Sequence, residues 1–474
     1  MTFDMVVVDS HVVLPHGIID KNIVINDGKI VKYTTDIPSC NYKINGAGLV
    51  SVPGPIDAHV HYGVYSPIDQ AAVTESHAAA IGGVTTMMRM LRLNGKFSTC
   101  LPPQLDASLS SHHIDYTAHA SIFTEQQVNE MNYCVENKIT SFKIYMNLAG
   151  EVGHVYMDMQ PESFKLQETK VDVTNNIVEE TVKRAASLQC PVLVHAEDYE
   201  SCACGMKTAK EKQQDGLDAW SKSRDPKYEE KAIETVCKYA RKYNCVIYFV
   251  HIGSKIALER IRVERSLGTN VYVETCPHYM VLSYETRDDY LAKVMPPIRS
   301  TTDNQAVWNA MYSGEINTVG TDHVANKLSL KVGSDVWESL AGFPGIGVSI
   351  PILLSEGVNR GRISLHQFTN LTSTNPAKIF SMYPQKGSLV CGYDADITIL
   401  DMKHEQKVTS DLFGGFSDYS VYEGMMLRGW PVKTIVRGSI IAENFTVIEK
   451  PGYGKLVSRK VAPLRPKGPS RELP

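Results

Sequence analysis

The feature that most constrains the fold is an alternation of short apolar runs with longer amphipathic stretches in the middle of the chain. Stretches of helical periodicity, such as 174–188 and 228–243, separate these runs. The alternation is typical of a parallel sheet covered by helices, and eight repeats predict an α/β fold of the (β/α)8 TIM-barrel type. A doubly wound open sheet is the alternative. The eight runs are 55–61, 83–88, 115–122, 141–146, 191–196, 246–251, 270–276 and 317–322.

Both ends of the chain have a different sequence pattern. Short segments in which apolar and polar residues alternate with period two are separated by turns that contain Gly or Asp. This pattern predicts short strands and hairpins, which we expect to join into one small β-sandwich domain. The last residues are rich in Pro, Lys and Arg and indicate an extended arm, which we expect to pack on a neighbouring subunit. The expected boundaries are 1–52 and 385–445 for the two β-sandwich segments, 53–384 for the barrel and 446–474 for the C-terminal arm.

Composition excludes several classes of function. The chain has 474 residues, 43% of them apolar, which is enough for a large buried core. It carries 48 Lys and Arg against 52 Asp and Glu, so no positive field attracts a nucleic acid. No apolar run reaches the roughly 18 residues of a spanning helix, and the first residues contain no basic targeting segment. We expect a cytoplasmic protein without a nucleic-acid or membrane partner.

Metal-capable side chains fall where the predicted strands end. A barrel brings the C-terminal ends of its strands to one mouth, where active sites of this fold lie. His59 and His61 are two residues apart and therefore lie on the same side of a strand, where two imidazoles can bind one divalent ion. A single histidine in such a place is more often a core or surface residue, but together these residues predict a metal centre. The full set is His59, His61, Lys143, His195, His251 and Asp322.

Lys143 lies in the fourth run and has two possible roles. Burial lowers the pKa of a lysine, and the neutral amine then reacts with carbon dioxide to give an anionic carbamate with two oxygens. Such a group is able to bridge two metals. The alternative is a structural ion pair with Asp322 or Glu274.

The motifs around these residues, taken in order, resemble those of the cyclic amidohydrolases, in particular the dihydropyrimidinase and hydantoinase group. The resemblance covers nearly the whole chain. It implies the barrel and the β-sandwich predicted above. The similar segments are 52–61, 142–146, 194–197, 250–254, 274–279, 296–299, 320–323, 375–380, 383–389 and 392–396.

The resemblance also implies two divalent metal ions, usually zinc. His59, His61 and Asp322 would hold one metal, His195 and His251 the other, and carboxylated Lys143 (N6-carboxylysine) would bridge them. The implied activity is that of a hydrolase of carbon–nitrogen bonds other than peptide bonds. A hydroxide between the metals would open a substituted hydantoin, dihydropyrimidine or imide ring. Asp322 would be the catalytic residue that passes the hydroxide proton to the leaving nitrogen.

The substrate-binding positions depart from the family pattern. A Tyr that helps to hold the oxyanion is replaced by Leu148, a Ser by Met295 and an Asn by Ala341. Unsubstituted dihydropyrimidine is therefore not the expected substrate. Asn147 and Tyr145 are candidate replacement donors, and Tyr65 is a further candidate substrate contact, although a packing role is open for each.

Arginines 89 and 92 follow the predicted second strand. An apolar pocket with one guanidinium fits a ring that bears a carboxylate, and a core or surface role fits either arginine as well. The same ligand set also occurs in allantoinase-like and dihydroorotase-like hydrolases, and a non-catalytic dihydropyrimidinase-like scaffold is a further alternative. The resemblance implies a homo-oligomer, either a tetramer or a dimer.

Overall fold

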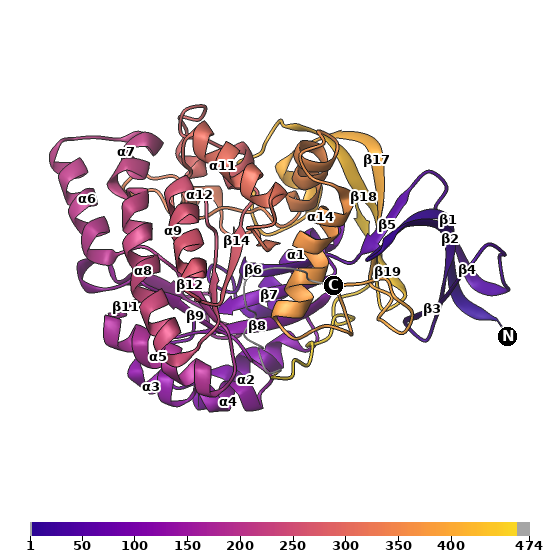
Figure 1. The fold of residues 1–474 in the computed structure, drawn as a ribbon, viewed down its shortest axis with the longest axis horizontal. Helices are drawn as coiled ribbons and strands as arrows, with labels where there is room; N and C mark the ends of the chain where they lie inside the picture. The colour runs from indigo at the N-terminus through magenta and orange to yellow at the C-terminus, as the bar shows by residue number, and fades with distance from the viewer. Residues whose placement is uncertain (1, 462–474) are drawn as a thin grey trace.

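The computed structural model describes residues 2–461, and the middle of the chain forms a parallel sheet rolled into a barrel (Figure 1). Strands β15 and β16 belong to one segment, in which β15 pairs with β14 and β16 pairs with β6, so this segment closes the ring. The predicted TIM barrel is confirmed. The strands are β6 (Ile56–His61), β7 (Thr86–Leu91), β8 (Asp115–Ser121), β9 (Phe142–Tyr145), β12 (Val192–His195), β13 (Ile247–Phe249), β14 (Val271–Thr275), β15 (Thr318–Val319) and β16 (His323–Val324).

The strands coincide with the predicted runs except in two places. Strand β7 lies three residues later than the predicted 83–88, because Gly83 has a φ of +85° and a side chain there would meet Pro431 at 2.7 Å. Arg89 is consequently inside the strand. The eighth run is divided into β15 and β16, since Asp322 between them has a φ of +50° and leaves the extended conformation.

Helices surround the barrel (Figure 1). Helix α8 illustrates why they form: Asp225 caps its first turn, Pro226 occupies its first position, and Asn244 ends it in the left-handed conformation. Its buried residues recur with helical spacing and face the barrel. The helices are α1 (Ile68–Ile81), α2 (Phe97–Ser108), α3 (Glu125–Asn129), α4 (Met131–Glu136), α5 (Asn175–Ser187), α6 (Tyr199–Glu211), α7 (Gly216–Ser223), α8 (Pro226–Tyr243), α9 (Lys255–Ser266), α10 (His278–Val281), α11 (Thr301–Tyr312), α12 (Leu328–Lys331), α13 (Ser349–Ile352), α14 (Leu365–Thr369) and α15 (Asn375–Ile379).

The two ends of the chain meet in a second sheet of nine strands, as expected from their alternation. Strand β5 pairs with β1 in parallel and with β17 in antiparallel orientation, which joins the N-terminal to the C-terminal strands. The sheet has a small core of its own, which includes Val7, Ile23 and Ile397. Its strands are β1 (Phe3–Leu14), β2 (Gly17–Asn26), β3 (Lys29–Thr34), β4 (Cys40–Asn45), β5 (Val50–Pro53), β17 (Ile397–Lys407), β18 (Met426–Val436), β19 (Ser439–Glu443) and β20 (Thr446–Val447). The exact domain boundaries stay a prediction, and β20 extends the sheet beyond residue 445.

A hairpin that the sequence did not indicate follows β9. Its strands, β10 (His154–Met157) and β11 (Gln167–Lys170), pair in antiparallel orientation and form a separate two-stranded sheet. The hairpin lies between β9 and α5, where a barrel needs only a connecting loop. It therefore adds a wall near the C-terminal ends of the barrel strands.

The C-terminal arm packs on the barrel as far as residue 461. Leu456 forms a β-bridge with Tyr116, and the buried guanidinium of Arg459 donates to Thr117 and Ser141. These contacts lie within one chain, and packing of the arm on a neighbouring subunit stays a prediction. Residues 462–474 lie outside the described residues, and assembly into dimers or tetramers stays a prediction.

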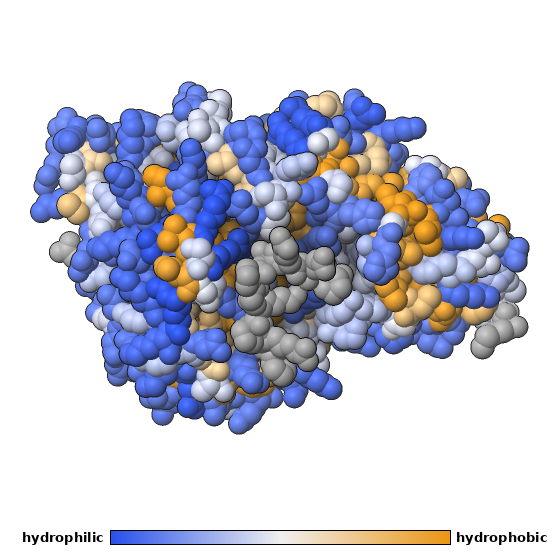
Figure 2. Space-filling model, viewed as in Figure 1, coloured by the Kyte–Doolittle hydropathy of each residue, from blue (hydrophilic) through white to orange (hydrophobic). Residues whose placement is uncertain are grey.

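The face drawn in Figure 2 is mostly hydrophilic over the barrel helices, and hydrophobic residues gather where the terminal sheet meets the barrel. Within residues 2–461, none of the helices combines the length and apolar character needed to cross a membrane.

Candidate metal centre and substrate pocket

A pocket of about 200 Å³ opens at the C-terminal ends of the barrel strands. All six predicted metal ligands line it, together with the five residues predicted to contact substrate. The barrel thus brings together residues that are up to 263 positions apart in the chain, from His59 to Asp322. The predicted residues in its lining are His59, His61, Lys143, His195, His251, Asp322, Tyr65, Asn147, Leu148, Met295 and Ala341.

Three of the predicted ligands converge on one point. Oδ1 of Asp322 lies 3.1 Å from Nε2 of His59 and 3.1 Å from Nε2 of His61, and the two imidazole nitrogens lie 3.3 Å apart. All three residues are buried. A carboxylate and two imidazoles in this arrangement form a donor set that suits divalent zinc.

The hydrogen bonds around His59 show that its inward nitrogen carries a lone pair. Nδ1 of His59 lies 2.7 Å from Oε1 of Glu274, and this acceptor assigns the ring proton to Nδ1. Burial raises the pKa of Glu274 to about 7. The Tyr248 hydroxyl and the backbone N–H of His251 also donate to Glu274, and these hydrogen bonds lower its pKa and so limit the increase. Burial lowers the pKa of His59 to about 3, so the ring is neutral and its Nε2 faces Asp322 without a proton. A cation between them removes this repulsion, and the residues therefore fit a metal.

The second group of predicted ligands lies beside the first. The ring of His251 is 5.4 Å from that of His59 and 4.6 Å from that of His195, measured between centroids. Lys143 is fully buried, and its Nζ has no hydrogen-bond partner among the described residues. Burial lowers the pKa of Lys143 to about 7. The alternative ion pair of Lys143 with Asp322 or Glu274 is not present in the described structure.

The backbone places two of the ligands in uncommon conformations. His251 and Asp322 have φ angles of +44° and +50°, in the left-handed region that non-glycine residues seldom occupy. Asp57 fixes the Asp322 segment, because its carboxylate accepts from the backbone N–H of His59 and from the N–H and hydroxyl of Thr321. The glycine at position 320 must lack a side chain, since a Cβ there would lie 2.6 Å from the Glu274 carboxylate.

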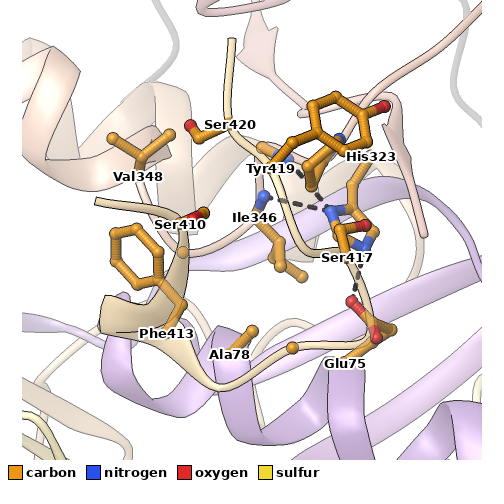
Figure 3. A pocket seen from close by; sticks show the side chains of 14 residues that line it. Glu75, Ala78, His323, Ile346, Val348, Ser410, Phe413, Ser417, Tyr419 and Ser420 are labelled. Carbon is orange, nitrogen blue, oxygen red and sulfur yellow. Dashed lines mark hydrogen bonds and ion pairs between the residues drawn. The ribbon is translucent and has the colours of Figure 1, made fainter. Parts of the chain in front are cut away.

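His323, next to Asp322, is held on the far side of the strand (Figure 3). Its Nδ1 accepts from the backbone N–H groups of Gly345 and Ile346, and its Nε2 donates to Glu75 at 2.8 Å. Both ring nitrogens are thereby occupied. We infer that His323 anchors the closing segment and does not face the pocket.

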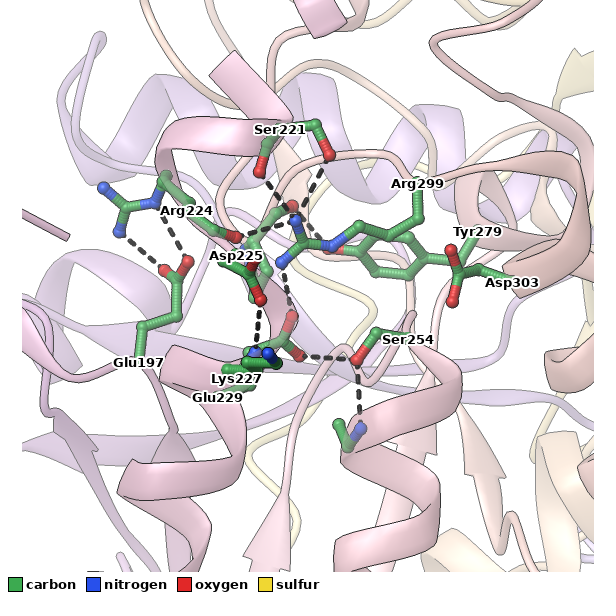
Figure 4. Close-up of polar contacts among 12 residues, drawn as sticks. Glu197, Ser221, Arg224, Asp225, Lys227, Glu229, Ser254, Tyr279, Arg299 and Asp303 are labelled. Carbon is green, nitrogen blue, oxygen red and sulfur yellow. Dashed lines mark hydrogen bonds and ion pairs between the residues drawn. The ribbon is translucent and has the colours of Figure 1, made fainter. Parts of the chain in front are cut away.

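A buried polar network that includes Glu197, Arg224 and Arg299 (Figure 4) supports His195 through Glu197. Nε2 of His195 lies 2.6 Å from Oε2 of Glu197, and Arg224 donates to both oxygens of that carboxylate. Arg299 donates to the backbone oxygen of Arg224 and pairs with Glu229. The hydrogen bond to Glu197 leaves Nδ1 as the ring nitrogen of His195 that is available for a metal.

The substrate side of the pocket is mainly apolar and aromatic. The rings of Tyr65 and Tyr156 lie 5.7 Å apart, and Oδ1 of Asn147 is buried without a hydrogen-bond partner in the described structure. Val155 and Tyr156, which come from the unexpected hairpin, also line the pocket and were not predicted. The alternation from residue 154 to 159 was the only signal for it.

Comparison with known proteins identifies the family. The model of the amidohydrolase family matches residues 167–441 of the chain. The chain belongs to this family. Within it, this amidohydrolase is a member of the cyclic amidohydrolases of the hydantoinase and dihydropyrimidinase group.

Its relatives match it over nearly the whole chain. The D-hydantoinase of Ralstonia pickettii is 30% identical, over 96% of this chain and 99% of its own, and the L-hydantoinase of Paenarthrobacter aurescens is 28% identical, over 97% and 98%. The crystal structure of a dihydropyrimidinase from Brevibacillus agri NCHU1002 superposes with a TM-score of 0.86 at 27% identity, over 96% of this chain and 99% of that one.

Proposed function

We propose that this amidohydrolase opens the carbon–nitrogen bond of a substituted hydantoin, dihydropyrimidine or imide ring with the help of two divalent metal ions. The observation that carries the proposal is the convergence of His59, His61 and Asp322, whose donor atoms lie 3.1 to 3.3 Å from one another. The hydantoinases and the dihydropyrimidinase named above add the substrate class, since they match this chain over nearly its full length.

In this proposal His59, His61 and Asp322 hold one ion, and His195 and His251 hold the second. The Lys143 side chain would hold both ions as a carbamate: its neutral Nζ attacks the carbon of carbon dioxide and forms the N–C bond, one C–O π bond opens to an anionic oxygen, and one proton is released. Full burial and the lack of another partner for Nζ support this assignment. Bound zinc ions would supply a hydroxide nucleophile between them and a Lewis acid for the ring carbonyl.

The side chains of this protein then position groups and move one proton. Asp322 accepts the proton of the attacking water on its free carboxylate oxygen and delivers it to the ring nitrogen as the C–N bond breaks. Glu274 and Glu197 hold the rings of His59 and His195 in one tautomer and one orientation.

Apolar side chains replace polar contacts on the substrate side of the pocket. Leu148, Met295 and Ala341 line it where the family pattern has a Tyr, a Ser and an Asn. Fewer hydrogen bonds are then available to the ring amide. The shape of the ring substituent therefore contributes more to recognition than the ring amide does.

The test combines metal analysis with a hydrolysis screen over hydantoins, dihydropyrimidines, cyclic imides, allantoin and dihydroorotate. We expect about two equivalents of zinc, manganese or cobalt per chain and turnover of at least one substituted ring. Turnover of allantoin or dihydroorotate alone would favour the allantoinase-like or dihydroorotase-like alternative. Absence of both metal and turnover would favour a non-catalytic scaffold and overturn the proposal.

A further inference from the structure

Arg92 places a guanidinium inside the pocket, one aromatic ring away from Lys143. It directly follows β7, and its Nε donates to the hydroxyl of Tyr145 at 3.4 Å. The Arg92 guanidinium carbon lies 5.4 Å from the centroid of the Tyr145 ring, and Nζ of Lys143 lies 5.0 Å from the same centroid. The positive charge of Arg92 therefore stands beside the reacting centre.

The Arg92 guanidinium has no ion-pair partner among the described residues, and its side-chain hydrogen bond is the one to Tyr145. No carboxylate lies within 4.0 Å of the Arg92 guanidinium, and its two terminal nitrogens donate to none of the described groups. Oδ2 of Asp158 accepts from a terminal nitrogen of Arg89 at 2.8 Å and from the backbone N–H of Arg92 at 3.0 Å. Gln104 accepts a second hydrogen bond from Arg89. Of the two arginines, Arg89 is thus held by Asp158 and Gln104, whereas the terminal nitrogens of Arg92 are available to a ligand.

The lining of the pocket offers Arg92 few carboxylates. Asp322 is the only carboxylate among the described lining residues, and it lies against the two imidazoles. The surfaces nearest the hairpin are apolar or aromatic, with Tyr65, Val155 and Tyr156. A partly desolvated cation in such surroundings is costly unless an anion joins it.

We propose that the substrate is a cyclic amide whose ring substituent ends in a carboxylate, and that Arg92 binds this carboxylate while the ring amide lies at the metal centre. The inference rests on the proposed function and extends it to a substrate class. A guanidinium binds a carboxylate with two parallel hydrogen bonds. One guanidinium balances one charge, so a carboxylate fits better than a phosphate, which carries about two. A short methylene chain would pack against Tyr65 and Tyr156.

The proposal also explains why the usual polar contacts are missing. Leu148, Met295 and Ala341 give the ring amide fewer hydrogen bonds than the family pattern does. An ionic contact between Arg92 and the ring substituent would orient the substrate and select for it in place of the missing contacts to the ring amide. The ring then needs fewer contacts of its own.

The experiment compares matched ring pairs. Hydantoins with a 5-carboxymethyl, 5-carboxyethyl or 5-carboxypropyl group are each paired with the corresponding primary amide, which has nearly the same shape without charge. We expect kcat/KM of the wild-type metal-loaded enzyme to favour at least one acid over its amide by about tenfold or more. In Arg92→Met this ratio should fall towards one, and in Arg92→Lys it should be intermediate because the charge remains without the planar fork. Arg360→Met, an exposed arginine outside the pocket, should keep the wild-type ratio.

Binding measurements separate this proposal from the proposed function. Calorimetric titration of wild-type and Arg92→Met protein with the acids and the amides should give tighter binding of the acid only in the wild type, whether or not the ring is opened. If no ring is hydrolysed but this difference persists, the hydrolytic function has failed and the Arg92 site stands. If rings are hydrolysed and the acid shows no advantage in turnover or binding, or if Arg92→Met keeps that advantage, the Arg92 proposal is overturned. If Arg92→Met does not fold, the proposal is tested by the acid-to-amide ratio of the wild type and by the change of that ratio in Arg92→Lys.

Discussion

Glu197 holds His195 through a 2.6 Å contact between Oε2 and Nε2. The same carboxylate receives two hydrogen bonds from Arg224, so the ring of His195 is fixed by a carboxylate that is itself fixed (Figure 4). The Arg224 guanidinium holds the pKa of Glu197 below its ordinary value despite burial. The orientation of a proposed metal ligand therefore depends on a residue that does not line the pocket.

We predict that Glu197→Gln weakens metal retention by about 10–100-fold, because the amide loses both the charge and one acceptor. The measurement is metal content after dialysis against a chelator of graded concentration. Glu200→Gln, an exposed substitution on α6, serves as the control and should retain metal like the wild type. Equal retention by Glu197→Gln and the wild type would show that His195 needs no support from Glu197.

Replacement of His61 tests the first metal site. His61→Ala removes one of three converging donors, and we expect loss of about one metal equivalent and a fall in turnover of about 100-fold or more. Elemental analysis and a steady-state assay measure the two effects. His16→Ala, at an exposed position of the terminal sheet loop, should change neither. Full activity of His61→Ala would remove the basis of the metal assignment.

The carbamate at Lys143 has a direct spectroscopic test. Protein equilibrated with 13C-labelled bicarbonate should show a carbamate carbon resonance that is absent from Lys143→Ala. That variant should also be inactive, and short carboxylic acids such as acetate should partly restore its activity by supplying the missing anion. A metal-loaded crystal structure with an unmodified ammonium at Lys143 would contradict the prediction.

Stability should change with pH through Lys293, which shapes the wall of the pocket near Met295. Burial, with repulsion from Arg224 and Lys210, lowers the pKa of Lys293 to about 7, and its side-chain nitrogen donates to the backbone oxygen of Ser339. Between pH 7 and the ordinary lysine value the unfolded chain holds the proton and the folded chain does not, so stability rises with pH in this window.

We therefore expect the free energy of unfolding of the wild type, measured against that of Lys293→Met, to increase by about 1–3 kcal/mol from pH 7 to pH 10. Denaturant titrations at several pH values check this. The exposed Lys238→Met provides the control, since its side chain is largely solvated. A constant difference between wild type and Lys293→Met would mean that Lys293 keeps its ordinary pKa in the fold.

The departure at Leu148 predicts specificity. The wild type should hydrolyse unsubstituted dihydrouracil weakly and a 5-substituted hydantoin better. Leu148→Tyr should raise kcat on dihydrouracil by at least about tenfold, because it returns an oxyanion donor. Leu148→Phe adds the ring without the hydroxyl and should not do so. Dihydrouracil turnover by the wild type as fast as that of any substituted ring would show that other groups replace the lost contact.

The sequence alone determined the barrel and which residues meet at its mouth. Parallel strands must be buried on both faces, so each one is a continuous apolar run that local pattern reveals. A polar residue at the C-terminal end of such a run lies at the mouth of a closed barrel. For this reason the residues from His59 to Asp322 lie together around one pocket, as expected. The joining of the two chain ends into one sheet followed from the period of their alternation.

Only the tertiary structure decided how individual polar groups are paired. Glu274 and His59 are 215 positions apart, and Asp158, which engages Arg89 and leaves Arg92 available, comes from the unexpected hairpin segment 66 positions beyond Arg92. The local sequence shows the periodicity of a helix or strand, but it does not show which distant carboxylate pairs with which cation. Which groups pair depends on differences of a few ångströms in their separation, because the strength of an ion pair in a medium of low dielectric changes steeply with distance.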